Sequence, residues 1–487
     1  MRPSFRQGNP TDTSADTLCV GIFDGEGVPA SVDEALGGAL ARLIESGEAK
    51  AAFKKLATLH PSGEGGPARV VVVGLGKRDE FDPERARIAG AVGSRRAAEL
   101  SARSIAWAVP EGVEQEPVAR ALTEGVLLAA YKFDRYKSAS GDEDKGIESL
   151  EIVSSEDVAQ AVEEAALVVE HQNTARDLQN LPANDLTPSK LADHALARVA
   201  EIDGLEGEVL GLDRIRQLEM GGLLAVAKGS HEEPRLIVLR YGTGDGPVLG
   251  LIGKAVTFDT GGISIKPAGK MQEMKMDMSG GAAVIEATAA IARLGLPIRV
   301  LAVVPATENM PSGHATRPGD IITISNGKTV EVNNTDAEGR LILADALAYA
   351  ASEGAERMID LATLTGAIIV ALGSTYAGLF SNDDSLSAAL TASSERTGEL
   401  VWRMPLHDDY KELTRGKVAD LVNVSEARKA SSAYAASFLE EFVDGKPWAH
   451  LDIAGTSWDQ DNRDYVGKGA SGWGVRLLVD LARSSAG

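Results

Sequence analysis

The sequence contains few of the residues on which several classes of protein depend. One of its 487 residues is a cysteine, Cys19, and 5% are aromatic. A single cysteine excludes an intramolecular disulfide and a metal site built from several thiolates, and the shortage of aromatic residues disfavours an aromatic-rich binding module. No apolar run approaches the roughly 18 to 20 residues that cross a bilayer. The first residues lead into a polar stretch rather than the apolar core of a signal peptide. We therefore expect a cytoplasmic protein.

Basic residues are also scarce. The chain has 49 lysines and arginines against 71 aspartates and glutamates, which gives a net charge of −22. So acidic a protein repels the phosphate backbones of nucleic acids unless its basic residues cluster. The densest basic groups, such as Arg95 with Arg96, are short and interrupted. The composition therefore disfavours nucleic acid as a partner.

Length and patterning predict two α/β domains. A chain of 487 residues exceeds one typical hydrophobic core. Apolar runs that alternate with helical stretches indicate a largely parallel sheet covered on both faces. We expect an N-terminal α/β domain at residues 1–155, a connecting helix and linker at 156–184, and a larger C-terminal domain at 185–487 with a central, mostly parallel or mixed sheet flanked by helices. Strands of the larger domain are predicted at 235–241, 248–256, 298–305, 329–332, 358–364 and 450–453.

The most informative stretch is Asn-Thr-Asp-Ala-Glu-Gly-Arg-Leu at residues 334–341. Asp336 and Glu338 are two positions apart, and in an extended segment such residues project to the same side. Converging carboxylates commonly hold a hard dication, and Arg340 follows directly. A simpler alternative is that both acids cap the alanine-rich helix predicted to begin at Leu341.

A second cluster of acids and lysines lies upstream. Asp259 stands between Lys254 and Lys266 in a glycine-containing segment, and Asp277 is flanked by methionines. Together with Asp336 and Glu338 these acids would repel one another strongly unless two divalent cations lay between them. None of the 7 histidines lies in either cluster, so the ligands would be mainly oxygens, which suits Mn²⁺ or Mg²⁺ and permits Zn²⁺. Taken one at a time, the lysines could be surface residues and Asp277 a satisfied buried acid.

The basic side chains suggest further roles. A lysine beside dications loses its proton more readily, because like charge disfavours the ammonium form, and could then serve as a nitrogen ligand. The other lysine, kept charged, could polarise a carbonyl and stabilise an oxyanion. Arg340 stays charged at neutral pH and is suited to holding an anion. Together the segments suggest a metal-dependent hydrolase.

At these segments the chain resembles the leucyl aminopeptidase (cytosol aminopeptidase) family of two-metal, hexameric metallopeptidases. The octapeptide at 334–341 matches in full, and the block at 253–267 matches with Ala255, Val256 and Thr260 as departures. The likeness continues at 274–278, 360–367 and 448–456, and extends over residues 170–482. The N-terminal third matches only in size and α/β character.

The resemblance implies a metal-dependent aminopeptidase, a hydrolase that removes N-terminal amino acids from peptides by means of a water held between two divalent metals. Leucine-like residues would be preferred within a broad range, the metals would be Mn²⁺ or Zn²⁺, and the protein would be a cytoplasmic homohexamer whose residues 185–487 form the catalytic domain. Asp259 and Glu338 would bridge the metals, Asp336 would complete one site, and Lys254 with Asp277 the other. The resemblance also implies two catalytic residues and three substrate-binding ones: Lys266 acting on the scissile carbonyl, Arg340 holding bicarbonate, and Met274, Thr363 and Gly366 lining the pocket for the first side chain.

A larger departure lies at residues 423–432, where members of the family often have glycine and alanine. This departure leaves open which N-terminal residue of the substrate is preferred. Three alternatives therefore stand beside a broad aminopeptidase. One is a narrow-substrate dipeptidase or amidohydrolase, such as one cleaving Cys-Gly. The second is a DNA-binding regulator, which the net charge disfavours, and the third is a scaffold without catalysis.

Overall fold

The computed structural model describes residues 1–61, 66–138, 146–242, 246–425, 429–460 and 463–485. The chain divides into two compact units, one formed by residues 1–170 with 463–467 and the other by residues 171–462 with 468–487. The boundary between the two units, after residue 170, falls within helix α5 (Ala159–Asn180). No helix within the described residues is both long enough and apolar enough to cross a membrane.

The first unit is a six-stranded sheet covered by helices. The strands run in the order β1-β6-β5-β2-β4-β3, and every neighbouring pair is parallel except β3 with β4. Alternate residues of β2 belong to two hydrophobic clusters: Cys19 lies in the cluster that includes residues of α3 and α4, and Leu18 in the cluster that includes residues of α1 and α2. The expected N-terminal α/β fold is thereby confirmed. The strands are β1 (Arg2–Gln7), β2 (Thr17–Phe23), β3 (Leu56–Leu59), β4 (Arg69–Gly76), β5 (Ser104–Ala108) and β6 (Ser149–Ser154), and the helices are α1 (Ala30–Ala35), α2 (Ala39–Glu45), α3 (Pro83–Glu99) and α4 (Gln115–Ala129).

The second unit is built on a nine-stranded mixed sheet, with the order β16-β15-β18-β14-β9-β11-β8-β7 and β10 paired to β11. The central strands β18, β14, β9 and β11 are parallel, whereas β7, β8 and β15 introduce antiparallel pairs. This is the mixed sheet that the sequence predicts. The strands are β7 (Leu205–Leu210), β8 (Arg235–Gly242), β9 (Val248–Gly253), β10 (Ala255–Asp259), β11 (Arg299–Asn309), β14 (Arg357–Ala362), β15 (Ala377–Ser381), β16 (Val401–Arg403) and β18 (Trp448–Asp452).

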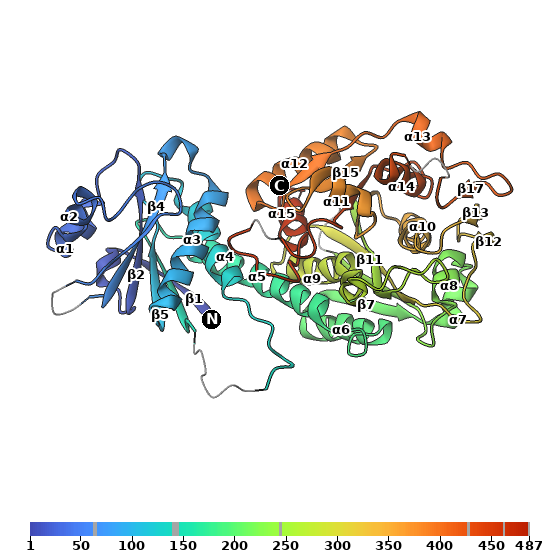
Figure 1. Ribbon diagram of the computed structural model, residues 1–487, viewed down its shortest axis with the longest axis horizontal. Helices are drawn as coiled ribbons and strands as arrows, with labels where there is room; N and C mark the ends of the chain where they lie inside the picture. Colours follow the sequence, from blue (N-terminus) through green and yellow to red (C-terminus); the bar gives the residue numbers. More distant parts are fainter. Residues whose placement is uncertain (62–65, 139–145, 243–245, 426–428, 461–462, 486–487) are drawn as a thin grey trace. The chain divides into compact units, whose positions relative to one another are not determined.

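Helices pack on both faces of this sheet (Figure 1). The cluster that contains Ile252, Leu301 and Val303 of the sheet also contains residues of α8, α10 and α14, and α9 packs against the same central strands with α15 beside it. The helices are α6 (Pro188–Glu201), α7 (Leu212–Gln217), α8 (Gly221–Ala227), α9 (Ser279–Arg293), α10 (Gly339–Ser352), α11 (Gly366–Leu372), α12 (Asp384–Thr397), α13 (Asp408–Glu412), α14 (Ser431–Glu440) and α15 (Val475–Ser485). A small sheet of β12 (Asp320–Thr323), β13 (Thr329–Val332) and β17 (Leu421–Val422) completes the unit.

The sequence predicts one strand at residues 248–256, but the structure contains two. Strand β9 ends at Gly253 and β10 begins at Ala255, so Lys254 lies at the break. The Lys254 N–H donates to the carbonyl of Leu361, and the Lys254 carbonyl accepts a hydrogen bond from the N–H of Gly281. These two bonds divert the chain to β10, which pairs with the far end of β11. The break places the Lys254 side chain where the parallel strands end.

Candidate metal centre

The candidate side chains gather at the carboxyl ends of the central strands. Asp259 is the last residue of β10, and Asp336 and Glu338 lie in the loop between β13 and α10. Thr363 follows β14 directly, and Asp277 follows the short 3-10 helix η3 (Met271–Met276). The carboxyl ends of strands are where ligands bind in open α/β sheets. All ten candidate residues line one cavity of about 330 Å³: Lys254, Asp259, Lys266, Met274, Asp277, Asp336, Glu338, Arg340, Thr363 and Gly366.

Three acids are close enough to share a cation. Asp259, Asp336 and Glu338 each offer one oxygen, and these oxygens lie within 4.8 Å of one another. Asp259 and Glu338 are each 2% exposed. Buried carboxylates are costly unless they are paired or bound to a metal, and oxygen ligands of this kind suit hard divalent ions.

Two lysines bridge the four acids in pairs. The Nζ atom of Lys254 lies 2.8 Å from both Asp277 Oδ1 and Glu338 Oε1. The Nζ atom of Lys266 lies 2.7 Å from Asp259 Oδ2 and 2.6 Å from Asp336 Oδ1. Four carboxylates against two ammonium groups leave an excess of negative charge. Asp277 Oδ2 is also buried without a hydrogen-bond partner, so the donor set fits further cations.

The electrostatics of the cluster follow from burial and crowding. Burial raises the pKa of Asp259, and the nearby Glu338 raises it further. Burial alone would lower the pKa of Lys254, but the surrounding carboxylates of Asp277, Glu338 and Asp259 outweigh it, so the pKa lies above its ordinary value. Among the acids alone Lys254 is therefore an ammonium group. The proton loss expected of a lysine ligand requires positive charge from bound cations.

A glycine permits the approach of Lys254. A Cβ atom added at Gly339 would lie 2.7 Å from Lys254 Cε and 2.8 Å from its Nζ. Any larger residue would therefore displace the lysine from Glu338. The glycine within the octapeptide at 334–341 is explained by this close packing.

Arg340 is a buried cation on the wall of the same cavity. Its side chain is 5% exposed, and one terminal nitrogen donates to the carbonyl of Asn423 at 2.6 Å. The ring of Tyr434 lies under the guanidinium at 5.6 Å, while Arg340 Nε is buried without a hydrogen-bond partner. No carboxylate among the residues described here forms an ion pair with Arg340 within 4.0 Å. Such a guanidinium is suited to binding an anion.

Thr363 and Gly366 belong to the turn after β14. The Thr363 hydroxyl donates to Asp277 Oδ1 at 2.7 Å, and the Thr363 carbonyl accepts from Lys254 Nζ at 3.0 Å. Gly366 is the first residue of α11, and a Cβ atom added there would meet no atom within 4 Å. Met274 approaches the cavity from η3. This wall leaves room for a side chain beside the acids.

Sequence reasoning missed the asparagines and the acid that hold these groups in place. Asn309 Nδ2 donates to Asp259 Oδ1 at 2.8 Å and to the Thr335 carbonyl at 3.0 Å. Asp452 accepts hydrogen bonds from the N–H groups of Leu364 and Thr365 and from the Thr365 hydroxyl. In the sequence, Asn309 could have been found as a polar residue at the end of a long apolar run. No comparable sequence pattern marks Asn423.

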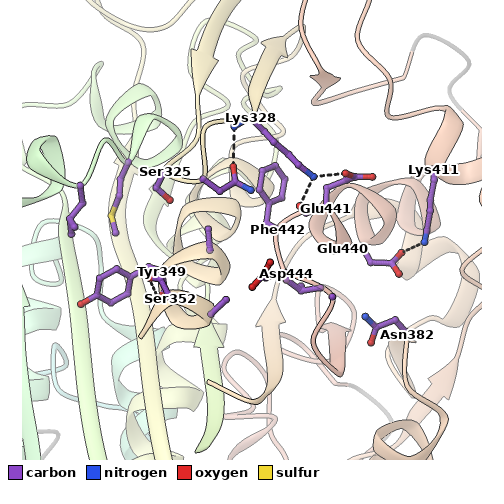
Figure 2. A pocket seen from close by; sticks show the side chains of 17 residues that line it. Ser325, Lys328, Tyr349, Ser352, Asn382, Lys411, Glu440, Glu441, Phe442 and Asp444 are labelled. Atoms are coloured by element: carbon purple, nitrogen blue, oxygen red, sulfur yellow. Dashed lines mark hydrogen bonds and ion pairs between the residues drawn. The ribbon is translucent and has the colours of Figure 1, made fainter. Parts of the chain in front are cut away.

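A larger cavity of about 650 Å³ lies at the other end of α10. Figure 2 shows it lined by Tyr349 and Ser352 of that helix and by two ion pairs. Lys328 Nζ lies 2.6 Å from Glu441 Oε2, and Lys411 Nζ lies 3.0 Å from Glu440 Oε2. Each of these glutamates has a lysine partner, so this cavity lacks the crowded carboxylates of the smaller one.

Comparison with known proteins gives consistent matches over nearly the whole chain. Residues 173–479 match the catalytic domain of the cytosol aminopeptidase family, and residues 19–140 match its N-terminal domain. The chain is 45% identical to a probable cytosol aminopeptidase of Roseiflexus castenholzii over 99% of both proteins. It is 46% identical to one of Solibacter usitatus over 96% of both.

Solved structures give the same result. The bottromycin maturation enzyme BotP in complex with Mn is 36% identical, with a TM-score of 0.86 over 97% of this chain and 100% of that one. A mutant of tomato leucine aminopeptidase is 33% identical, with a TM-score of 0.88 over 99% of this chain and 96% of that one.

Proposed function

The chain belongs to the cytosol aminopeptidase family, and we propose that it removes leucine-like and other residues from peptides with a free N-terminus. It is a metal-dependent aminopeptidase. The observation that carries the proposed substrate and site is the meeting of four acids, two lysines and Arg340 in one cavity of about 330 Å³. A volume of this size suits the end of a peptide.

The metal ligands of this proposal are Lys254, Asp259, Asp277, Asp336 and Glu338. Asp259 and Glu338 would be shared by two metal ions, with Asp336 completing one site and Lys254 with Asp277 the other. The close approach of the oxygens of Asp259, Asp336 and Glu338 supports this ligand set. The Mn complex of BotP supports Mn²⁺ as the metal, and Zn²⁺ is the alternative. When bound, two such ions would polarise the substrate carbonyl and lower the pKa of a nearby water.

Lys266 acts on the reacting carbonyl. Its ammonium group is held between Asp259 and Asp336, and their carboxylates outweigh burial and keep its pKa above the ordinary value. A charged donor in this position stabilises the oxygen of the peptide bond as negative charge develops on it. The ammonium keeps its proton throughout, so Lys266 contributes charge rather than base.

Arg340 would hold a bicarbonate. Its buried guanidinium has an Nε atom without a partner, which supports an anionic ligand. Bicarbonate would supply the proton acceptor that the four acids cannot, because they are committed to metal. The Arg340 guanidinium would hold the bicarbonate through directed hydrogen bonds.

Met274, Thr363 and Gly366 form the pocket for the first side chain. Ile369 and Ala454 line the same cavity and add apolar surface, which favours leucine-like residues. The requirement for a free N-terminus would follow from the metals, since a free amine offers a lone pair to a bound metal ion, which the nitrogen of an acetylated amide lacks. A panel of dipeptides that included Cys-Gly would separate a broad enzyme from a narrow one.

Assembly, location and domain limits complete the proposal. We place the protein in the cytoplasm as a homohexamer, with domains at residues 1–155 and 185–487 joined by 156–184. The names of the relatives support the location. Sedimentation of the purified protein tests the hexamer, and limited proteolysis tests the boundaries, with resistant fragments expected to correspond to the two domains.

The activity is tested on leucine p-nitroanilide. The protein is first stripped of metal with a chelator and then supplied with Mn²⁺, with N-acetyl-leucine p-nitroanilide as the matched substrate that lacks a free amine. Cleavage restored by metal and confined to the free-amine substrate supports the proposal. Equal cleavage of both substrates, or none with any divalent metal, contradicts it.

A further inference from the structure

Asn423 lies directly behind the loop that carries two of the proposed metal ligands. It follows β17, which pairs with β13, the strand that leads into this loop. Asn423 is 0% exposed, and its N–H donates to the Glu331 carbonyl at 2.9 Å. Its position is therefore fixed by the small sheet.

Both the oxygen and the nitrogen of the Asn423 side-chain amide form hydrogen bonds with this loop. Oδ1 accepts from the N–H groups of Asn333 and Asn334 at 2.8 and 3.3 Å. Nδ2 donates to the carbonyls of Asn334 and Ala337 at 2.7 and 3.4 Å. Two donors face the oxygen and two acceptors face the nitrogen, so only an amide in this orientation satisfies all four. These bonds reach the loop on either side of Asp336.

The backbone of Asn423 contacts Arg340 as well. Its carbonyl accepts the 2.6 Å bond from the Arg340 guanidinium, and this is a charge-assisted hydrogen bond. The preceding carbonyl, of Val422, accepts from the hydroxyl of Tyr434, whose ring lies under the same guanidinium. Asn423 and Tyr434 thus hold Arg340 from two directions.

We propose that Asn423 is a positioning residue for the metal centre, whose amide sets the Asn333–Ala337 loop and whose carbonyl aims Arg340. The inference rests on the proposed function, because it concerns the ligands Asp336 and Glu338 and the anion-binding role of Arg340. One buried residue then fixes the acid loop and the guanidinium relative to each other. Removing a group that orients a metal ligand without itself binding the metal typically lowers metal affinity or activity 10- to 100-fold.

Two substitutions separate the amide's bonds from its volume. Asn423→Ala removes all four side-chain bonds. Asn423→Asp keeps the size and the acceptor for Asn333 and Asn334, but turns an oxygen toward the carbonyls of Asn334 and Ala337. Asn382→Ala is the control for the loss of side-chain amide bonds, because Asn382, although exposed, also binds a backbone segment that is distant in the sequence, donating to the Lys446 carbonyl and accepting from the Trp448 N–H. Asn382 lines the larger cavity instead.

The full-length protein is stripped of metal, and Mn²⁺ affinity is measured by titration calorimetry beside kcat and KM for leucine p-nitroanilide. We expect both Asn423 variants to bind Mn²⁺ about 10-fold more weakly and to lose about 10- to 100-fold in kcat, and to need more bicarbonate for half-maximal rate. Asn382→Ala should change none of these. Wild-type affinity and kcat in Asn423→Ala, or equal losses in the Asn382 control, would overturn the inference.

Further outcomes remain distinguishable. If neither Asn423 variant folds, Tyr434→Phe tests the same arrangement, since it frees the Val422 carbonyl but keeps the ring under Arg340. We then expect a several-fold rise in the bicarbonate concentration for half-maximal rate with unchanged Mn²⁺ affinity, and an unchanged bicarbonate dependence would overturn the inference. A wild-type protein that neither binds Mn²⁺ nor cleaves the substrate refutes the proposed function itself, and the inference with it.

Discussion

The ammonium group of Lys254 lies 2.8 Å from the carboxylate of Asp277, and these side chains are only 3% and 7% exposed. Lys254 lies between the end of β9 at Gly253 and the start of β10 at Ala255. Removing one member of a buried ion pair leaves the other charged and without compensation, which costs far more than the intact pair contributes. The metal-free protein therefore depends on Lys254 for its stability.

Substitution of Lys254 by methionine should destabilise the metal-free protein by about 3 to 5 kcal/mol, since it strands Asp277 and Glu338. Urea unfolding in the presence of a chelator measures the change. Lys270→Met is the control: Lys270 is 77% exposed and 3.8 Å from Glu273, so we expect a change within about 0.5 kcal/mol. Equal changes in the two variants would contradict the assignment.

Glu286 predicts how stability responds to acid. Burial alone would raise its pKa, but hydrogen bonds with His171 and His194 outweigh burial and bring the pKa to about 2. Because the folded pKa lies below the ordinary 4.5, the unfolded chain binds more protons as the pH falls. The stability that the Glu286 carboxylate contributes to the folded protein is present above pH 4.5 and is lost between about pH 4.5 and pH 2.

Glu286→Gln should therefore flatten the acid dependence of unfolding relative to wild type, by up to about 3 kcal/mol across that whole window and by about 2 kcal/mol between pH 5.5 and pH 3. Urea midpoints at pH 5.5 and at pH 3 measure it. Glu201→Gln is a matched control, because Glu201 pairs with the Arg198 that also contacts Glu286 but is 60% exposed. A wild-type dependence that survives in Glu286→Gln would rule out this carboxylate as the source.

The sequence alone was sufficient to predict the fold class and to predict that the candidate residues lie close together. Polar residues that follow buried parallel strands meet at one edge of the sheet, so Asp259, Asp336 and Thr363 could be assigned to one place without coordinates. The roles of these residues are still predictions. The two-unit α/β organisation is confirmed by the matches to both family domains.

Other features depend on contacts that no local pattern encodes. The run at 248–256 is apolar apart from Lys254. The strand breaks at this lysine, whose backbone is hydrogen-bonded to Leu361 and Gly281, two residues that are distant in the sequence. Asn423 acts on Arg340 across 83 residues. Strands β16 and β17 contain 3 and 2 residues, too few for a periodic pattern. Of the departure at 423–432, residues 426–428 lie outside the described part of the chain.

Lys266 is predicted to act in the transition state rather than in metal binding. Lys266→Met should lower kcat by about 10²- to 10³-fold, the usual loss when an oxyanion donor is removed, with Mn²⁺ affinity within a few-fold of wild type. Steady-state kinetics and calorimetry separate the two effects. Lys270→Met, on the rim of the same cavity, should retain normal kcat. A loss of Mn²⁺ affinity as large as the loss of kcat would assign Lys266 to the metal site.

Gly366 is predicted to set the size of the first-residue pocket. Since an added Cβ meets no atom within 4 Å, Gly366→Ala should fold with normal stability and fill cavity space instead. One methyl group in such a pocket changes discrimination by about 10-fold or more, so kcat/KM should fall for leucine p-nitroanilide relative to alanine p-nitroanilide. Gly313→Ala, also free of contacts within 4 Å but absent from the cavity lining, should leave the ratio unchanged. A ratio that is the same in both variants would place the first side chain elsewhere.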